Sequence, residues 1–535
     1  MKHIVCILFT FFILFSGCKN ESFFEFERPV QNPWLTLSEF ERAPIGSYNR
    51  LFGRGGYINS FSAWYCYKNA VADDVSWLTY GDSWGWFRDT NDQKNFLPYV
   101  FRNSYEVIAS VNDAFSFIEE NNGNPYPQTS DFNKKNNLDR IIGELYFLRG
   151  FAYYMCATVY CDAYVPGGAN DGKQIPLIIK RANGYDEAVR PKIGTVQEIW
   201  SHIQSDFEIA YELLPERYMP GMALSYQAGR ATKFAAAAML VRTHFAMGDY
   251  NKAKEYADFV IEQNKGDYDL SEDPIEAFNK TTLSRGKEVI LWIPNYDQVT
   301  NSPDEFMGSF NHLRIGVVNG WTECNMDAAT LKRIGWMNNP KQDINISFNN
   351  VALRDKRFTQ LMAVREPVTV PVAQQMQDRY YMDERVLYTC VFANKNARGA
   401  DIDTYEARYT NYPIIRLAEM YLTRAICRFK AGDKAGAASD LNIVRKRAWD
   451  AGVAGEAYES SSHYVTTDNV TAEMIGDERI IEMYCEGDRI DYLRGLKENV
   501  GNGERTFVGI VPYTDKGFVW AIPLNETSLN LSYEK

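Results

Sequence analysis

Ser83 lies in the segment Gly81-Asp-Ser-Trp-Gly85, which matches the G-x-S-x-G pattern of a hydrolase nucleophile. In that fold the serine sits on a sharp turn between a buried strand and a helix, and an acid and a histidine complete the catalytic triad. Here a polar segment follows Gly85, and the chain beyond it lacks the alternating strands and helices of a hydrolase. An extracellular serine hydrolase is therefore the least favoured interpretation, and the sequence predicts a protein that is not an enzyme.

Glu482 and Glu486 lie four residues apart, a spacing that on a helix could serve acid–base catalysis. We expect this helix to begin at Asp477, because aspartate is a good N-cap. Charges of opposite sign recur three to four residues apart along the segment, where helix neighbours can pair. They are Glu478, Arg479, Glu482, Glu486, Arg489, Asp491 and Arg494. Neighbouring arginines should keep both carboxylates ionised, so a structural role is the stronger interpretation.

The segment around Trp84 is dense in aromatic and polar side chains. Trp faces stack on the CH-rich faces of sugar rings, while Asp, Asn and Arg side chains bond pairs of hydroxyls. The predicted ligand-binding residues of this segment are Trp77, Trp84, Trp86, Asp73, Asp74, Asp82 and Arg88. The alternative is that the aromatic residues cover the core. Trp64, at helical spacing, is assigned to the core, whereas both interpretations stay open for Trp84 and Trp86.

Helical patterns surround that segment. Residues 37–77 are mainly helical with a glycine break at 53–56, and a helix or two follow over 95–120. Apolar residues between Ile141 and Val159 recur every three or four positions, which predicts one long helix. Thr195 is the expected N-cap of an amphipathic helix over Val196 to Leu214.

A repeat of helix pairs provides the expected scaffold. Residues 231–246 and 250–263 form two predicted helices joined at Gly248-Asp249, and residues 414–429 and 434–447 repeat the arrangement around Gly432-Asp433. In each pair an alanine, Ala253 or Ala437, lies five residues beyond the glycine. This spacing resembles tetratricopeptide helix pairs, in which small residues allow close helix packing.

The region between the two pairs, residues 267–412, has a different composition. Short strands are predicted over 289–293, 366–372 and 386–392, and the remainder is rich in Gly, Asn and Pro. We expect an irregular, loop-rich insertion supported by the helical half, and loops on rigid scaffolds are frequent binding sites.

Composition excludes several classes of protein. The net charge of −12 and the absence of basic clusters argue against a nucleic-acid partner. The seven cysteines left after Cys6 and Cys18 are an odd number, so they are predicted to be small buried hydrophobes. The histidines are widely scattered, so no metal or other cofactor is predicted.

The N-terminus has the layout of a secretory signal: Lys2 and His3 precede an apolar run from Ile4 to Phe15. The run ends in Leu14-Phe-Ser-Gly-Cys18, which resembles a lipobox, although Phe15 replaces the usual leucine. We therefore expect residues 1–17 to be removed and Cys18 to carry lipid, with a plain signal peptide as the alternative.

Four motifs together resemble the SusD/RagB family of Bacteroidetes surface lipoproteins. The segment from Asp477 to Arg494 is similar to its E-R-x-x-E-x-x-x-E-G-x-R-x-x-D-x-x-R signature. Gly143-Glu-Leu-Tyr-Phe-Leu-Arg-Gly-Phe-Ala-Tyr-Tyr154 resembles a family helix in which Gly150 stands where alanine is frequent. Arg416-Leu-Ala-Glu-Met-Tyr-Leu422 and Trp520-Ala-Ile-Pro-Leu-Asn-Glu526 resemble two further elements. The motifs span almost the whole mature chain.

The resemblance implies a mainly α fold, with a tetratricopeptide-like scaffold and a loop-rich irregular half containing a few short strands. It divides the chain into a signal (1–17), a lipid-anchored tether (18–36), two helical regions (37–266 and 413–535) and the insertion (267–412).

The resemblance also implies a function on the outer surface of the outer membrane. The expected function is to capture an oligosaccharide or polysaccharide and pass it to a SusC-like TonB-dependent transporter. Tyr296 and Trp321 in the insertion would join the binding site. A RagB-like protein that binds peptides or another nutrient is the alternative.

Overall fold

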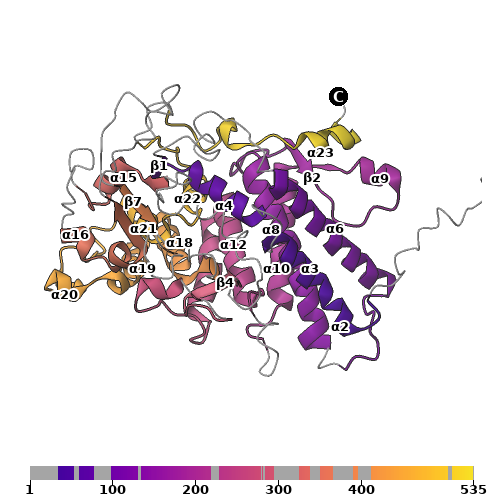
Figure 1. Cartoon of the computed structure of the whole chain (residues 1–535), viewed down its shortest axis with the longest axis horizontal. Coiled ribbons are helices and arrows are strands. Elements are labelled where there is room, and N and C mark those ends of the chain that lie inside the picture. The colour runs from indigo at the N-terminus through magenta and orange to yellow at the C-terminus, as the bar shows by residue number, and fades with distance from the viewer. Residues whose placement is uncertain are drawn as a thin grey trace, which may run out of the picture.

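The computed structural model describes residues 34–52, 60–77, 98–130, 134–218, 228–278, 280, 283–294, 324–337, 350–365, 390–393, 395, 411–503 and 509–533. Helices dominate this part of the chain, and its strands form two-stranded sheets, so the prediction of a mainly α fold with a few short strands is confirmed. Figure 1 shows most of the N-terminal helices at one end of an elongated molecule and most of the later helices at the other, whereas the last described α-helix lies at the N-terminal end.

The N-terminal helices surround one long central helix, α8 (Asp139–Tyr160), as the apolar periodicity predicted. The others are α2 (Leu37–Phe40), α3 (Arg42–Phe52), α4 (Ser60–Ala70), α6 (Pro98–Glu120), a π-helical turn (Lys134–Leu138), α9 (Tyr185–Val189) and α10 (Val196–Leu213). Helix α8 packs on α3, α6 and α10, so it is buried on nearly every side. Between α8 and α10, strands β2 (Lys173–Pro176) and β3 (Ile193–Thr195) pair antiparallel.

Helix α10 begins where its sequence predicted. The Thr195 side chain accepts a hydrogen bond from the backbone N–H of Glu198, and the Glu198 carboxylate accepts one from the N–H of Thr195. This reciprocal cap satisfies two N–H groups that would otherwise lack partners at the start of the helix.

The predicted repeat is present as two helix pairs, α12 (Lys233–Met247) with α13 (Tyr250–Glu262) and α18 (Leu417–Lys430) with α19 (Lys434–Ala448). Helix α13 packs on α18, so the pairs are stacked. Ala253 and Ala437 are fully buried, as the expected close packing requires. The prediction that residues 414–416 are helical is wrong: they belong to strand β8 (Tyr412–Arg416), which pairs with β4 (Val289–Ile293) and is buried along its length.

The described parts of the insertion contain short elements. They are a 3-10 turn (Pro274–Ala277), β4, β5 (Cys324–Met326), α15 (Ala328–Arg333), α16 (Asn350–Leu353), α17 (Lys356–Leu361), β6 (Met362–Arg365) and β7 (Cys390–Ala393). The strand predicted over 289–293 is confirmed by β4, and β7 overlaps the end of the one predicted over 386–392. Residues 366–372 lie outside the described part, directly after β6. Pairing of β4 with β8 joins the insertion to the C-terminal helices.

The C-terminal region ends in a series of short elements. They are α20 (Ala451–Ala454), a 3-10 turn (Tyr458–Ser460), α21 (Ala472–Met483), α22 (Arg489–Leu496), a 3-10 turn (Lys516–Phe518), α23 (Leu524–Leu529) and a last turn (Leu531–Tyr533). The prediction that Asp477 caps a helix is wrong. The N-cap of α21 is Thr471, six residues earlier, whose backbone is extended and whose hydroxyl accepts a hydrogen bond from Met474 N–H. Asp477 lies inside the helix and pairs with Arg333 at 2.8 Å.

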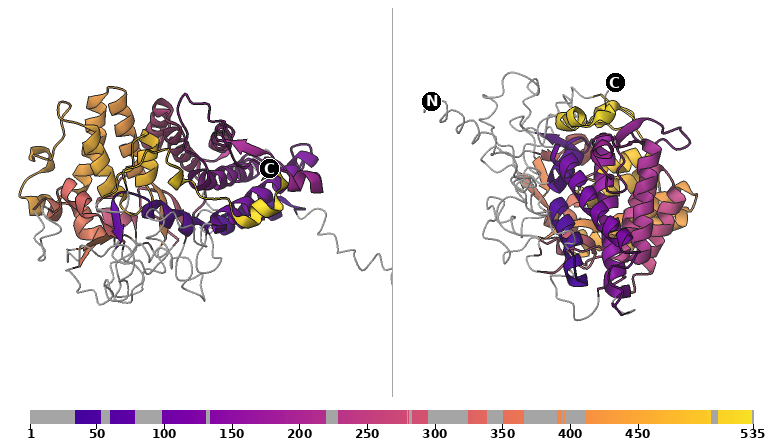
Figure 2. Two further views of the ribbon diagram at one scale, coloured as in Figure 1. Left: turned by 90° about the horizontal axis from the view of Figure 1, so that it is seen from above. Right: turned by 90° about the vertical axis from the view of Figure 1, so that its right-hand side faces the viewer.

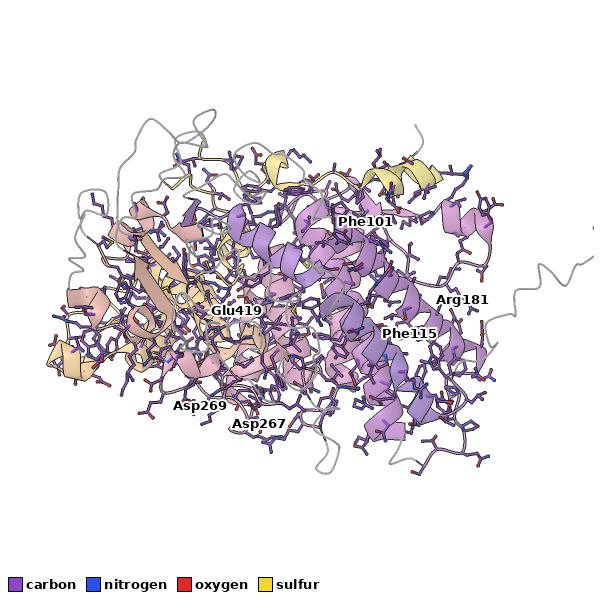
Figure 3. The ribbon with its side chains drawn as sticks, viewed as in Figure 1. Phe101, Phe115, Arg181, Asp267, Asp269 and Glu419 are labelled. Carbon is purple, nitrogen blue, oxygen red and sulfur yellow. The ribbon has the colours of Figure 1, made fainter. Side chains whose placement is uncertain are left out.

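Side chains fill the space between the helices in Figure 3, where Asp267 and Asp269 lie at the margin and Glu419, which is 2% exposed, lies in the interior. Cys156, Cys161, Cys427 and Cys485 are free and buried, as predicted for small hydrophobes. Among the described helices, none combines the length and the apolar character needed to cross a membrane. Figure 2 shows the segment around α23 lying along the outside of the N-terminal helices.

Candidate functional site

Most of the predicted ligand-binding residues lie outside the described part of the chain. These residues are Asp82, Trp84, Trp86, Arg88, Tyr296 and Trp321, and Ser83 and Cys18 lie outside it as well. Trp77 is described by its backbone, as the last residue of β1 (Val75–Trp77). Trp64, assigned to the core, is 2% exposed and donates a hydrogen bond from its Nε1 to the Thr158 hydroxyl at 2.8 Å.

Strand β1 brings together the starting points of two predicted ligand-binding segments. It pairs antiparallel with β5, and Trp77 is opposite Cys324. The segment containing Trp84 and Trp86 begins directly after Trp77, and Trp321 lies three residues before Cys324. Trp77 and Cys324 thus lie at the same end of the strand pair, although they are more than 200 residues apart in sequence.

Asp73 has a structural partner. Its carboxylate accepts hydrogen bonds from Arg489 Nε at 2.7 Å and Nη2 at 3.2 Å, and from the N–H of Gly501 at 3.2 Å. The side chain is about 10% exposed. This pair attaches the turn before β1 to the first residue of α22, within the motif that resembles the SusD/RagB signature.

Asp74, next to that pair, is buried, and its carbonyl accepts a hydrogen bond from Asp327 N–H at 2.9 Å. Burial, with the negative charge of Asp73, raises the pKa of Asp74 to about 7. Asp327 also caps α15, directly after β5. The pair of strands is thus connected to the helices on both sides by backbone and side-chain bonds.

Helix α4, which leads into β1, holds the turn between α21 and α22. Lys68 Nζ pairs with Asp491 at 2.6 Å, and Asn69 Oδ1 accepts a hydrogen bond from the N–H of Gly487 at 2.9 Å. The Tyr65 hydroxyl donates to the carbonyl of Cys485. Cys485 and Gly487 both have positive φ, at 57° and 69°, so these bonds fix a turn that most side chains disfavour.

Glu482 is fully buried among three arginines. Its carboxylate lies 2.6 Å from Arg447, 2.8 Å from Arg416 and 3.1 Å from Arg357. Burial alone would raise the pKa of Glu482, but the three guanidinium charges hold it well below its usual value. The carboxylate cannot supply a proton at neutral pH, which supports the structural interpretation.

The expectation that these charges pair with helix neighbours is wrong. The helix ends at Met483, and the partners of Glu482 come from α17, β8 and α19. Arg479 pairs with Asp488, nine residues later, at 2.6 Å. The face of α21 that carries Glu478 and Glu482 is buried. The ionic partners of these two residues therefore come from other elements that pack against this face.

The same cluster attaches the described ends of the insertion. The Glu486 carboxylate accepts hydrogen bonds from the Arg416 guanidinium at 2.6 and 2.8 Å. It also accepts one at 2.5 Å from the ammonium of Lys395, a residue that lies two positions after β7. Glu288, directly before β4, binds Arg416 at 2.6 Å and Arg447 at 3.1 Å. Sequence reasoning did not predict these partners, although an arginine within an apolar run, such as Arg416, is a usable signal.

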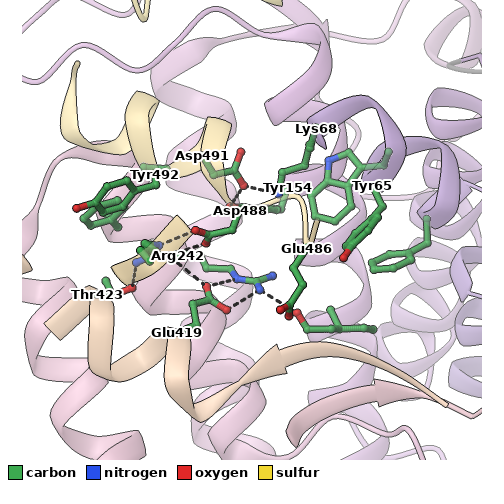
Figure 4. Close-up of a pocket in the computed structure, with 16 residues that line it drawn as sticks. Tyr65, Lys68, Tyr154, Arg242, Glu419, Thr423, Glu486, Asp488, Asp491 and Tyr492 are labelled. Atoms are coloured by element: carbon green, nitrogen blue, oxygen red, sulfur yellow. Dashed lines mark hydrogen bonds and ion pairs between the residues drawn. The ribbon is translucent and has the colours of Figure 1, made fainter. Parts of the chain in front are cut away.

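A cavity of about 30 Å³ lies beside this cluster (Figure 4). Ion pairs across it balance one another: Lys68 with Asp491, Arg479 with Asp488, and Arg242 with Glu419 at 2.7 Å. The volume suits about two water molecules and is far too small for a sugar ring. The cavity is therefore part of the scaffold.

Within the described ranges, no three His, Cys, Asp or Glu side chains gather as a metal ion requires. The geometry instead shows a charged scaffold that contacts the residues next to β1, β5 and β7.

Comparison with known proteins identifies two family models along the chain. Residues 322–518 match the model described as the SusD family, and residues 58–245 match one described as "Starch-binding associating with outer membrane". The two matches lie in different parts of the chain and include the helix with Gly143 to Tyr154 and the signature with Glu482.

One curated relative and many solved structures are similar. SusD-like protein P2 of Formosa agariphila is 25% identical over 214 residues, which are 39% of this chain and 36% of that protein, so the match spans about a third of the relative. A SusD superfamily protein from Bacteroides thetaiotaomicron superposes with a TM-score of 0.69 at 20% identity, covering 93% of this chain and 98% of the other. A SusD-like carbohydrate binding protein from Bacteroides fragilis gives 0.67 at 18% identity, with coverage of 94% and 99%. These structures share the fold.

Proposed function

Because this chain belongs to the SusD/RagB family, we propose that it is a cell-surface lipoprotein that binds an oligosaccharide or polysaccharide and catalyses no reaction. The family description of residues 58–245 names starch binding and association with the outer membrane. One solved relative is named as a carbohydrate binding protein. Both descriptions agree with a nutrient-capture role.

The observation that carries the proposal is the pairing of Trp77 with Cys324. Trp84 and Trp86 follow Trp77 by seven and nine residues, and Trp321 precedes Cys324 by three, so the pairing supports a site to which both segments contribute. Sugar rings bind where aromatic faces and polar rims converge, so one ligand could contact side chains from both segments. The ligand-binding residues in this proposal are Trp77, Trp84, Trp86, Asp82, Arg88, Tyr296 and Trp321.

The proposed partner is a SusC-like TonB-dependent transporter in the outer membrane, to which the bound glycan is passed. Lipid on Cys18 would hold the protein at the outer cell surface. Co-purification of such a transporter with the full-length protein, in detergent and without cross-linking, is the result that this part of the proposal requires.

The direct test is calorimetry and affinity electrophoresis of residues 19–535 against a panel of polysaccharides and oligosaccharides. A Trp84→Ala/Trp86→Ala variant should lose binding, because each aromatic platform contributes on the order of 1 kcal/mol or more to ligand affinity. The matched control is Tyr185→Ala, which removes an aromatic ring that is 76% exposed on α9, far from β1. This control should bind as the unmodified protein does.

The other outcomes distinguish the alternatives. Binding that persists in the double variant would place the site on the insertion, with Tyr296 and Trp321. Binding of oligopeptides but of no glycan would replace the proposal by the peptide-binding alternative. Turnover of a glycan or ester that Ser83→Ala abolishes would show that the protein is an enzyme.

A further inference from the structure

A second cavity of about 30 Å³ lies where α8, α10, α12 and α22 meet. Helix α8 packs on α10, α10 on α12, and α12 on α22. Helices of the N-terminal half therefore meet the C-terminal helix α22 at this junction. The lining side chains that matter are Trp200, Arg494, Lys497, Asp162, Asp491 and Tyr154. The family comparison assigns no role to this cavity.

Two buried N–H donors at this cavity have no acceptor in the described part of the chain. They are Nε1 of Trp200, whose side chain is only 4% exposed, and Nε of Arg494. Arg494 uses Nη1 to bond the carbonyl of Thr158 at 3.3 Å. A buried donor without an acceptor costs about 1–3 kcal/mol, so an acceptor within the cavity would stabilise the fold.

The charges around the cavity are also unbalanced. Both acidic residues have their own lysines, since Asp491 pairs with Lys68 and Asp162 with Lys516. Arg494 and Lys497 form no ion pair with any carboxylate in the described ranges. Two cations therefore face the cavity without a matching negative charge.

The hydrogen bonds of Lys497 leave room for one more acceptor. Its ammonium donates to the carbonyl of Ala246 at 2.6 Å and to that of Tyr164 at 3.0 Å. An ammonium has three N–H donors, so one has no oxygen acceptor in the described part of the chain, where the ring centroid of Tyr513 lies 5.5 Å from Nζ. Burial and the charge of Arg494 lower the pKa of Lys497 to about 7, as expected for a cation that lacks a counter-charge.

We propose that this cavity binds a small monovalent anion of about the size of chloride, between Trp200, Arg494 and Lys497. A water molecule could accept the two hydrogen bonds but carries no charge to match Arg494 and the protonated form of Lys497, whereas a halide supplies both an acceptor and a negative charge. The cavity has space for about two water molecules, which suits one such ion. This proposal is independent of glycan binding.

Thermal unfolding of residues 19–535 tests the proposal at pH 7 and constant ionic strength, with sodium chloride replacing sodium gluconate, whose anion is too large for the cavity. Chloride should raise the Tm by about 1–3 °C, with saturation in the millimolar range. Lys497→Met should abolish this rise. Lys252→Met is the matched control, because Lys252 lies on the surface and pairs with Glu255, and it should keep the rise.

Crystals grown in sodium bromide provide a second readout that needs no variant. An anomalous peak in the cavity beside Trp200, Arg494 and Lys497 is the expected result. Equal Tm values in chloride and gluconate, a rise that persists in Lys497→Met, a rise that requires molar salt, or a cavity without a bromide peak would each overturn the proposal. If Lys497→Met does not fold, the bromide experiment on the unmodified protein decides.

Discussion

At the scale of single residues, buried charges are the main feature of this protein. Glu482, Glu288 and Arg416 are each at most 1% exposed, yet each forms at least two short ion pairs. Removing both partners of such a pair can be neutral, but removing one leaves an uncompensated charge in the interior. The carboxylates of the signature are therefore expected to matter more for stability than for chemistry.

Glu482→Gln should lower the free energy of unfolding by about 3–5 kcal/mol, because it leaves Arg357, Arg416 and Arg447 with too little negative charge. Urea-induced unfolding followed by circular dichroism measures this change. Glu459→Gln makes the same chemical change in an exposed pair with Lys446 and should leave the unfolding midpoint unchanged. Equal effects of the two substitutions would contradict the structural role of Glu482.

Asp74 predicts a dependence of stability on pH. Its pKa is raised from 3.8 to about 7 by burial and by Asp73. Between these values the unfolded state loses the proton while the folded state keeps it, so this group lowers the free energy of unfolding as pH rises from about 4 to 7. Above pH 7 the cost is constant, up to about 4 kcal/mol.

Asp74→Asn removes that cost, because the amide stays neutral at every pH. The variant should therefore be more stable than the unmodified protein at pH 8, with a smaller difference at pH 5, in thermal unfolding at both values. Asp73→Asn, in contrast, loses the pair with Arg489 and should be destabilised. A gain from Asp74→Asn that is the same at both pH values would refute the buried-acid explanation.

At the scale of elements, the two helix pairs use the same turn in different surroundings. Gly248 and Gly432 both have left-handed φ values, 81° and 85°, and each follows the first helix of its pair. A Cβ on Gly248 would lie 2.6 Å from Cγ of Pro166, whereas a Cβ on Gly432 would meet no atom within 4 Å. Only the turn at Gly248 therefore packs closely against another part of the chain, the segment with Pro166.

Gly432→Ala should lower the free energy of unfolding by about 1–2 kcal/mol, the cost of a left-handed conformation for a residue with a Cβ. Gly248→Ala should cost about 2–4 kcal/mol, because the contact with Pro166 adds to that strain. Chemical unfolding of the two variants side by side gives the comparison. A Gly432→Ala variant at least as destabilised as Gly248→Ala would contradict this explanation.

At the scale of the whole molecule, one charged cluster on α21 and α22 joins distant parts of the chain. Arg489 holds the turn before β1, Arg416 lies on β8, and Lys395 follows β7. Strands β1, β7 and β8 are thus all connected to this one charged cluster. If the proposed ligand-binding segments bind a ligand, anchored strands beside them would reduce the conformational entropy lost on binding.

The lipid anchor is a whole-molecule prediction, drawn from Leu14 to Cys18. A lipid chain buried in a bilayer stabilises attachment by about 0.8 kcal/mol for each CH₂ group. Cys18→Ala should therefore move the protein from the membrane fraction to the soluble fraction when cells are fractionated. Cys6→Ala changes a cysteine of the removed segment and should leave the protein in the membrane fraction. Membrane retention of Cys18→Ala would exclude the predicted anchor.

Much of the helical architecture could be predicted from the sequence, because helices are encoded locally. The apolar period of α8, the cap at Thr195 and the Gly-Asp turns of the two pairs all involve residues within about five positions of one another. The four motifs, read together, also identified the family. Of the predicted ligand-binding side chains, the structure describes only those of Asp73 and Asp74, so the role of the others stays a prediction.

The pairing of distant groups was decided by the tertiary structure alone. The sequence placed opposite charges near Glu482, but its partners come from α17, β8 and α19, because a buried carboxylate binds whichever cation the fold brings to it. In the same way, the helical pattern of α18 extends back over residues 414–416 in the sequence. These residues form part of strand β8 instead, because β4 lies alongside and pairs with them. The register of Trp77 with Cys324, and the unmatched cations Arg494 and Lys497, depend on contacts between segments hundreds of residues apart, which no local pattern of residues records.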